Sequence, residues 1–327
     1  AGSSAASDVY KRQTATTTGA TTVTLTATDN VWSVTGAALT TALADGVFLV
    51  GALTVTAIAD GKETAALTAF TNALTGATSI TLAASDTNWS VTGAALTTAL
   101  GKGMFLAGTL TVTDIANGSE TAALSAFTTT LTGATSVTLT ATDGIWSVAT
   151  ADLATALTAG VRFAGALTVT GIANGDETAA LTAFTATKTG ATTVTLTSDG
   201  AWSVTAANLT TALAAGVRFA GTLTVTAIAN GDETAALTAF TATKTGATSV
   251  TLTATDNVWS VTGAALTTAL ADGVFLVGAL TVTAIADGKE TAALTAFTNA
   301  LTGATSITLA ASDTNWSVTG AALTTAL

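Results

Sequence analysis

The chain contains no cysteine, no histidine and no proline among its 327 residues. The lack of cysteine excludes disulfide bonds and thiolate metal sites, and it leaves the redox compartment undetermined. The lack of both cysteine and histidine excludes Ser-His and Cys-His nucleophile pairs and histidine-rich zinc sites. We therefore expect that the protein is not an enzyme and has no catalytic residue and no cofactor. The lack of proline suits an uninterrupted stack of repeated elements.

Charge is also scarce. Only 9% of the residues are charged, against about 25% in ordinary soluble domains, and the mean hydropathy is +0.60. The net charge of -11 at pH 7 argues against a nucleic-acid partner, because phosphates require a basic surface. Uncharged stretches such as residues 121–142 are interrupted by threonine, glycine and serine, so we expect no membrane span.

A surface with so few charges predicts either lateral packing against other copies of the chain or a covering of glycans. Self-association into filaments is the expected partnership, and the many threonine hydroxyls offer attachment points for sugars. N-glycosylation sequons also occur, including those that begin at Asn88, Asn208 and Asn315. An acidic, solvent-facing material of this kind is expected outside the cell or on the cell surface.

Tryptophan recurs at a nearly constant spacing, at Trp32, Trp89, Trp146, Trp202, Trp259 and Trp316. The successive spacings are 57, 57, 56, 57 and 57 residues. An aspartate stands three residues before each tryptophan, as Asp29, Asp86, Asp143, Asp199, Asp256 and Asp313. Such a period is typical of solenoids, in which each repeat buries its apolar face against the next.

Each repeat contains two versions of a shorter pattern, in which a strand-like run leads to a helix-like run. Thr22, Thr24 and Thr26 alternate with aliphatic residues, which predicts a strand with one buried face. In the second version, Leu53, Val55 and Ala57 are expected on one face, with Thr54, Thr56 and Ile58 on the other. Two runs have the spacing of one helix face: Leu39, Ala42 and Leu43, and then Ala66, Leu67, Phe70 and Leu74.

Helix ends are also marked in the sequence. Asp60 stands three residues before Glu63, which predicts a capping box in which Asp60 caps the helix and Glu63 reaches back. Glycines at positions 46, 76, 160 and 273 are expected to end helices in the left-handed conformation.

Alternating strands and helices predict an α/β solenoid, with a parallel sheet, helical crossovers and two strand-helix half units in each 57-residue repeat. The alternative is a helix-free β-solenoid, because threonine is a poor helix former. The continuous array is expected to cover residues 14–327, with about five and a half repeats.

Residues 1–13 do not follow the repeat. Within them, residues 8–13 resemble the translation of a transposase adapter used in short-read DNA libraries, so we expect this tail to be an artefact. Residues 14–100 recur as residues 241–327, with differences only at Thr17 against Lys244 and Thr22 against Ser249. The near-identical block indicates either a recent duplication in a longer array or a join made during sequence assembly, and we expect the natural chain to continue beyond both ends.

The aspartate series has two interpretations. Because an aspartate and a glutamate recur in every complete repeat, they are expected to serve turns and helix starts and not one unique active site. A ladder of calcium sites along stacked turns is the alternative. The glycine-rich nonapeptides of calcium-binding β-rolls are absent, which favours turn capping.

The tryptophan series also has two interpretations, as a buried ladder sealing successive repeats or as a stacking platform for carbohydrate. Burial is favoured, and the phenylalanines at positions 70, 127, 184, 240 and 297 are expected in the core. A separate position carries phenylalanine in some repeats and arginine in others, which predicts an outward-facing slot for contacts between neighbouring copies. Its occupants are Phe48, Phe105, Arg162, Arg218 and Phe275.

The segment from Leu110 to Val148 resembles the Ala/Thr-rich tandem repeats of large bacterial surface and secreted adhesin-like proteins. The resemblance implies an extracellular structural or adhesive role, so the expected function is a filament or cell-surface fibre built by stacking and lateral association. Two alternatives stay open. Threonine ranks such as Thr24 and Thr26 resemble the flat arrays of ice-binding solenoids, and the tryptophans suit a carbohydrate-binding module.

Overall fold

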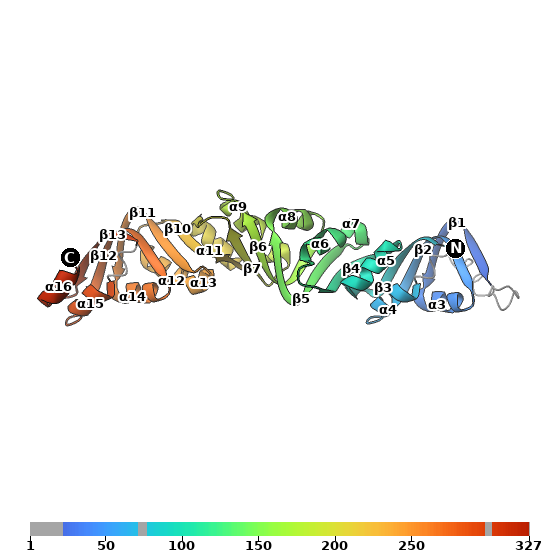
Figure 1. Cartoon of the computed structure of the whole chain (residues 1–327), viewed down its shortest axis with the longest axis horizontal. Helices are drawn as coiled ribbons and strands as arrows, with labels where there is room; N and C mark the ends of the chain where they lie inside the picture. The colour runs from blue at the N-terminus through green and yellow to red at the C-terminus, as the bar shows by residue number, and fades with distance from the viewer. Residues whose placement is uncertain (1–21, 71–76, 298–302, 327) are drawn as a thin grey trace. The chain divides into compact units, whose positions relative to one another are not determined.

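The computed structural model describes residues 22–70, 77–297 and 303–326. Strands and helices alternate along the chain, and the strands pair in parallel within open sheets (Figure 1). The fold is therefore α/β, and its helices exclude the helix-free alternative. The tail at residues 1–13, Leu74 and the glycine at position 76 lie outside the described residues, so the predictions made for them have no structural counterpart here.

The chain divides into two compact units, and the division falls within strand β6. The first comprises the described residues up to Gly165 together with Thr189–Ala191, and the second comprises Ala166–Lys188 together with the described residues from Thr192 onward.

The elements of the first unit are β1 (Val23–Thr35), α3 (Gly36–Ala44), β2 (Val47–Ile58), α4 (Glu63–Ala69), β3 (Ala77–Thr92), α5 (Gly93–Gly101), β4 (Met104–Ile115), α6 (Glu120–Ala126), α7 (Thr129–Thr132), β5 (Ser136–Ala149) and α8 (Thr150–Thr158). Two elements contribute residues to both units, namely β6 (Val161–Ile172) and α10 (Ala186–Thr189). The second unit adds α9 (Glu177–Ala183), β7 (Thr193–Ser198), β8 (Trp202–Thr205), α11 (Ala206–Ala214), β9 (Val217–Ala220), β10 (Thr222–Ile228), α12 (Glu233–Ala239), α13 (Ala242–Thr245), β11 (Ser249–Thr262), α14 (Gly263–Ala271), β12 (Val274–Ile285), α15 (Glu290–Ala296), β13 (Ala304–Ala311) and α16 (Gly320–Ala326).

Each long strand takes part in two successive sets of paired strands. Residues 47–50 of β2 pair with the start of β1, whereas residues 52–55 pair with the end of β1 on one side. On the other side, residues 51–55 pair with the start of β3. The register shifts that separate these segments recur in β3, β4, β11 and β12. The strands are thus staggered: the first part of β2 pairs only with β1, whereas its second part pairs with β1 on one side and with β3 on the other.

The core lies between the sheet and the helices. Across β1 to β4, residues in register form a buried inner rank of Trp32, Leu53, Ile80 and Met104. The second unit has the matching inner rank Trp202, Leu223, Val250 and Val274, also buried. Burial of such a rank requires residues from several consecutive strands, so one strand-helix pair cannot complete a core alone.

The helices bury the predicted face against this sheet. Leu39, Ala42, Ala66, Leu67 and Phe70 are all buried, which confirms the helical spacing read from the sequence, although Leu43 is only half-buried. Gly36, at the start of α3, lies against the ring of Phe70, and a Cβ atom there would be 3.5 Å from it, an ordinary van der Waals contact. The predicted helix ends are also confirmed at Gly46, Gly160 and Gly273, which have φ values of 71°, 79° and 73°.

Two local predictions are wrong. Ala57 is exposed and Ile58 is buried, because Ala57 adopts a left-handed conformation with φ of 56° and shifts the alternation by one residue. Asp60 does not cap α4, whose first residue is preceded by Lys62 without a side-chain capping bond. In α6, α9 and α12 the first glutamate accepts, through Oε2, from the glycine amide two residues earlier at 2.6–2.7 Å, which is not the amide that a capping box would use.

Threonine caps the longer helices instead. The Oγ1 atoms of Thr35, Thr92, Thr205 and Thr262 accept hydrogen bonds from the backbone amide three residues later, at 3.2–3.3 Å. These residues have extended backbone conformations, as N-caps require. The sequence carried this signal as the Thr that follows each Trp-Ser-Val, except at Ala149.

Candidate functional site

A recurring polar contact joins a tryptophan to the strand that follows it. The Nε1 atoms of Trp32, Trp89, Trp146 and Trp259 donate to the carbonyl oxygens of Val50, Ala107, Ala164 and Val277, at distances of 2.9–3.2 Å. In each case the acceptor lies 18 residues farther along the chain and directly before a glycine. The indole rings of these four residues are buried, between 0% and 7% exposed.

The aspartate series shapes the loop before each of these tryptophans. Asp29, Asp86, Asp143, Asp256 and Asp313 accept, through Oδ1, from the backbone amide two residues later at 2.9–3.1 Å. Asx turns of this kind fix the loop without any ligand. The next residue in each loop is left-handed, with φ between 56° and 71° at Asn30, Thr87, Gly144, Asn257 and Thr314.

The loop and the following strand meet at the glycine. A Cβ atom built on Gly51, Gly108, Gly165 or Gly278 would lie 2.1–2.2 Å from the carbonyl oxygen of the left-handed loop residue. No side chain fits in that space. We call this arrangement the glycine junction: the glycine, the carbonyl before it that accepts from tryptophan, and the left-handed loop residue.

Trp202 and Trp316 depart from this arrangement. Trp202 is buried, but its Nε1 is the one buried side-chain nitrogen or oxygen atom of the described residues that has no hydrogen-bond partner. In the loop before Trp202 the turn is made by Ser198 and not by Asp199, since Ser198 Oγ accepts from the Gly200 amide at 3.2 Å. Trp316 follows the last described strand and is 39% exposed.

The outer face of the sheet carries hydroxyl groups in register. In the first unit, Ser33, Thr54, Thr81 and Phe105 are paired across β1 to β4, and we call this set the outer rank. The second unit repeats it as Ser203, Thr224, Thr251 and Phe275, across β8, β10, β11 and β12. The phenylalanine at the fourth place is half-buried in both units.

The slot that the sequence predicts, with phenylalanine in some repeats and arginine in others, is the fourth place of the outer rank. Arg218 takes it beside Thr195 in the second unit, and Phe48 takes it beside Thr24 in the first. All five slot residues are half-buried. Arg162 Nη1 donates to the carbonyls of Val161 at 2.8 Å and Leu157 at 3.2 Å, and Arg218 makes the equivalent bonds to residues 217 and 213. The guanidinium thus satisfies carbonyls near the end of the preceding helix, where a cation is favourable.

The slot residue varies together with its inward-facing neighbour. Where the slot holds arginine, the next residue is Phe163 or Phe219, and each ring meets a tryptophan edge-on, with centroids 5.1 Å apart. Where the slot holds phenylalanine, the next residue is Leu49, Leu106 or Leu276. Each of these residue pairs therefore contains one phenylalanine, which occupies either the slot or the inward-facing position that follows it.

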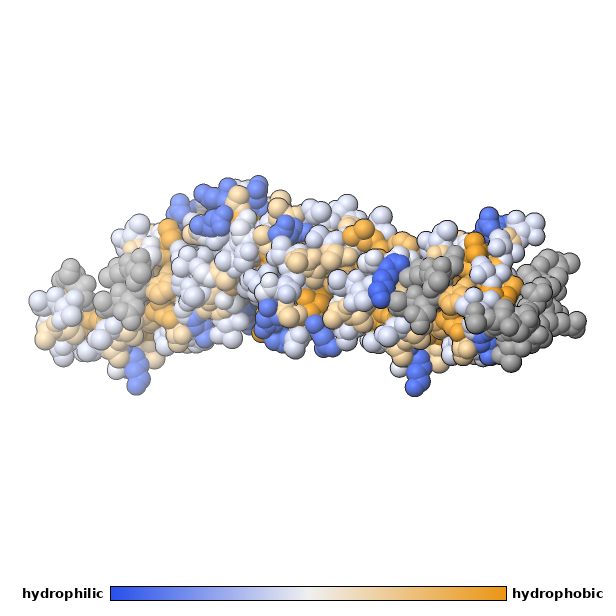
Figure 2. All heavy atoms as spheres, turned by 45° about the vertical axis from the view of Figure 1, so that its right-hand side comes forward, coloured by the Kyte–Doolittle hydropathy of each residue, from blue (hydrophilic) through white to orange (hydrophobic). Residues whose placement is uncertain are grey.

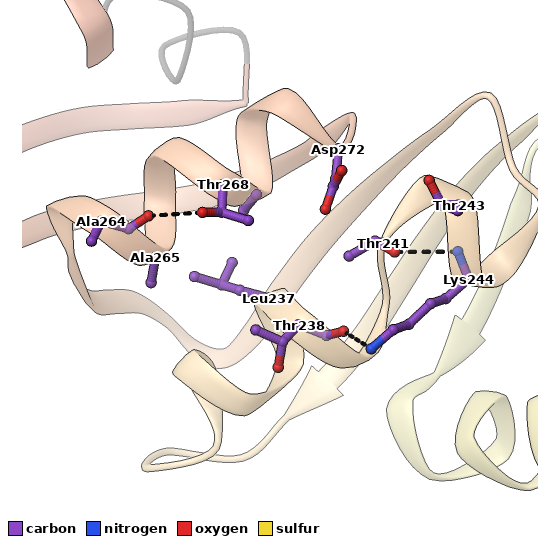
Figure 3. A pocket seen from close by; sticks show the side chains of 10 residues that line it. Leu237, Thr238, Thr241, Thr243, Lys244, Ala264, Ala265, Thr268 and Asp272 are labelled. Carbon is purple, nitrogen blue, oxygen red and sulfur yellow. Dashed lines mark hydrogen bonds between the residues drawn. The ribbon is translucent and has the colours of Figure 1, made fainter.

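The helix layer has shallow hollows between consecutive helices. The larger of two in the second unit has a volume of about 590 Å³ and lies between α12, α13 and α14 (Figure 3). Its lining includes Lys244, but Nζ already donates to the Thr238 carbonyl at 2.6 Å. Asp272 lies at the same hollow, and most of the remaining lining consists of alanine and threonine.

Threonines on the exposed side of the helices are bonded to their own backbone. The Oγ1 atoms of Thr40, Thr97, Thr210 and Thr267 donate to the carbonyl four residues earlier at 2.8–2.9 Å. The surface that results has little charge: Figure 2 shows strongly hydrophilic residues scattered among neutral and hydrophobic ones.

Within the described ranges, no three acidic side chains gather closely enough to hold a metal ion. No helix in the described part of the chain is long and apolar enough to cross a membrane. Of the sequon asparagines named above, Asn88 and Asn315 are exposed and Asn208 is half-buried.

No known relative emerges. No protein-family model matches the chain, and neither a curated protein nor a solved structure matches it.

The sequence alone located the tryptophan, aspartate and slot positions but not the glycine junction that connects them. The signal was present, since a glycine stands 19 residues after every tryptophan from Trp32 to Trp259. Its meaning depends on the left-handed loop residue, because only the folded loop brings that carbonyl against the glycine.

Proposed function

We propose that the chain is a structural repeat protein whose α/β repeats stack as a solenoid and form an extracellular filament or cell-surface fibre. The glycine junction carries the proposal. Four of the tryptophans donate a hydrogen bond to the strand that follows them, and the inner rank of Trp32, Leu53, Ile80 and Met104 draws its members from four strands. A repeat of this kind gains stability from its neighbours, which is the property of a stack.

The recurring residues support a structural and not a catalytic role. The aspartates serve their own loops, and three of the glutamates bond to backbone amides beside the helix starts. We propose that these side chains bind no substrate and no cofactor, and that glycans on exposed hydroxyl and asparagine groups add to the solvated surface.

Lateral association is the second part of the proposal. Phe48, Phe105 and Phe275 place aromatic surface on the outer face of the sheet, beside uncharged threonines. Burial of such rings between two copies is favourable, since each ring removes apolar area from water. Arg162 and Arg218 are already bonded to helix carbonyls, so we assign the contacts to the phenylalanines.

A swap between natural slot pairs tests the lateral contact. Replacing Phe105 by Arg and Leu106 by Phe reproduces the pair found at Arg162 and Phe163, so the variant should fold, with unchanged circular dichroism. We expect sedimentation velocity to show weaker association, and electron microscopy to show fewer or thinner bundles. The reverse swap, Arg162→Phe with Phe163→Leu, should strengthen association. A parent chain that stays monomeric at every concentration would contradict the proposal.

An ice-binding function is the second candidate, supported by in-register pairs such as Thr54 with Thr81 and Thr111 with Thr138. A flat, unobstructed threonine face is its requirement, and the phenylalanine or arginine at the fourth place interrupts that face. Thermal hysteresis with shaped ice crystals would favour it over the filament.

A carbohydrate-binding module is less well supported, because the tryptophans proposed as stacking platforms are buried at positions 32, 89, 146, 202 and 259. Binding to glycan arrays that is lost in Trp146→Ala but kept in an equally destabilised core variant would support it.

A further inference from the structure

The repeat that contains Trp202 is one residue short, which is why one tryptophan spacing is 56 and not 57. Four residues, 198–201, stand where the Trp146 repeat has five, 141–145. Ser198 pairs with Ile172 just as Ala141 pairs with Ile115, so the missing residue belongs to the loop itself.

The shorter loop cannot form the glycine junction. None of residues 198–201 has a positive φ, whereas Gly144 has φ of 71° at the equivalent place. A Cβ atom on Gly221 would meet nothing within 4 Å, whereas one on Gly165 would lie 2.2 Å from the Gly144 carbonyl oxygen. The loop therefore no longer packs against the strand, and Trp202 Nε1 lacks the partner that Trp146 has in Ala164.

The strands are interrupted at the same place. β7 ends at Ser198 before β8 begins at Trp202, and β9 ends at Ala220 before β10 begins at Thr222. In the Trp259 repeat, by contrast, β11 and β12 run through without a break. The break coincides with the boundary between two sheets: β7 and β9 are the last strands of one sheet, and β8 and β10 belong to the other.

We infer that residues 198–202 and 220–222 form a weak joint, at which the second unit opens locally while the neighbouring repeats stay closed. Three interactions present in other repeats are missing here: the Asx turn, the contact between loop carbonyl and glycine, and the indole hydrogen bond. Segments with fewer such interactions open at a lower free energy than their neighbours. In an array the joint confines bending or local unfolding to one repeat. The inference concerns the single chain and does not depend on filament formation.

Hydrogen exchange measured by mass spectrometry on the whole chain tests it. The control must be the Trp146 repeat, because the Trp32 and Trp259 repeats share the sequence TATDNVWSVTGAAL and give identical peptides. We expect amides of residues 202–205 and 222–225 to exchange at least about tenfold faster than those of residues 146–149 and 166–169. Equal protection in the two repeats would overturn the inference.

Loop exchange provides the matched variants. Placing the five residues Ala-Thr-Asp-Gly-Ile of positions 141–145 in place of residues 198–201 restores the full loop, and we expect exchange at Trp202 to slow to within about twofold of the Trp146 repeat. The converse variant, with Ser-Asp-Gly-Ala in place of residues 141–145, should speed exchange around Trp146 and Ala164. The inference fails if the restored loop folds without slowing exchange. If the restored chain does not fold, the comparison within the parent chain still decides.

Discussion

The contribution of the tryptophan hydrogen bond to stability can be measured by making the same substitution at two positions. Trp146 and Trp202 are both buried, at 0% and 1% exposure, and each meets a phenylalanine ring edge-on at 5.1 Å. They differ in that Trp146 Nε1 donates to the Ala164 carbonyl at 3.2 Å, whereas Trp202 Nε1 has no partner. Replacement by phenylalanine removes similar apolar area at both sites, so the difference between the variants isolates the hydrogen bond.

Trp146→Phe leaves the carbonyl of the half-buried Ala164 without this donor, which costs about 1–3 kcal/mol beyond the loss of ring area. Trp202→Phe removes a buried donor that was already unpaired, so the stability changes only through the loss of ring area. We expect urea unfolding to show a larger loss of unfolding free energy for Trp146→Phe, by about 1–3 kcal/mol. Hydrogen exchange at residues 164–167 and 220–223 would assign the loss to the correct repeat. Equal losses in the two variants would refute the role given to this bond.

Three further predictions concern the stability of single variants, each measurable by thermal and urea unfolding. Gly221→Ala should lower the free energy of unfolding by about 1–3 kcal/mol, because the φ of Gly221 is +90°. Gly165→Ala should lower it by about 1–3 kcal/mol more, since the added Cβ would also collide with the Gly144 carbonyl. Similar losses in the two variants would contradict the glycine junction. Thr262→Ala should lose about 1 kcal/mol of helix capping that Thr262→Ser retains, and an equal loss in both would show that the hydroxyl does not cap. Phe219→Leu should lose about 0.5–1.5 kcal/mol of edge-on ring contact yet remain folded, because leucine occupies this place in other repeats; an unfolded variant would show that the ring is essential there.

The periodic part of the fold was readable from the sequence because it depends on local rules. Alternation placed Leu53 and Val55 on one strand face, and helical spacing placed Leu39 and Phe70 toward the core, where the structure buries all four. Glycines at helix ends were also correctly placed, since few other residues adopt a left-handed conformation at low cost.

The errors occurred where a single residue changes the pattern. Ala57 takes a left-handed conformation although it is not glycine, and nothing local in its sequence announces this. The capping aspartate at position 60 had the right chemistry, but the helix begins farther on, after Lys62. The consequence of one missing residue before Trp202 could not be foreseen either, because it depends on a contact between segments about 20 residues apart.

The threonines bonded to their own helices change what this protein presents to water. A hydropathy scale counts Thr40, Thr97, Thr210 and Thr267 as polar, yet each uses its O–H group on a carbonyl of the same helix. A hydroxyl engaged in this way has no hydrogen atom left to donate to solvent. The exposed faces of these helices are therefore wetted less readily than their composition suggests.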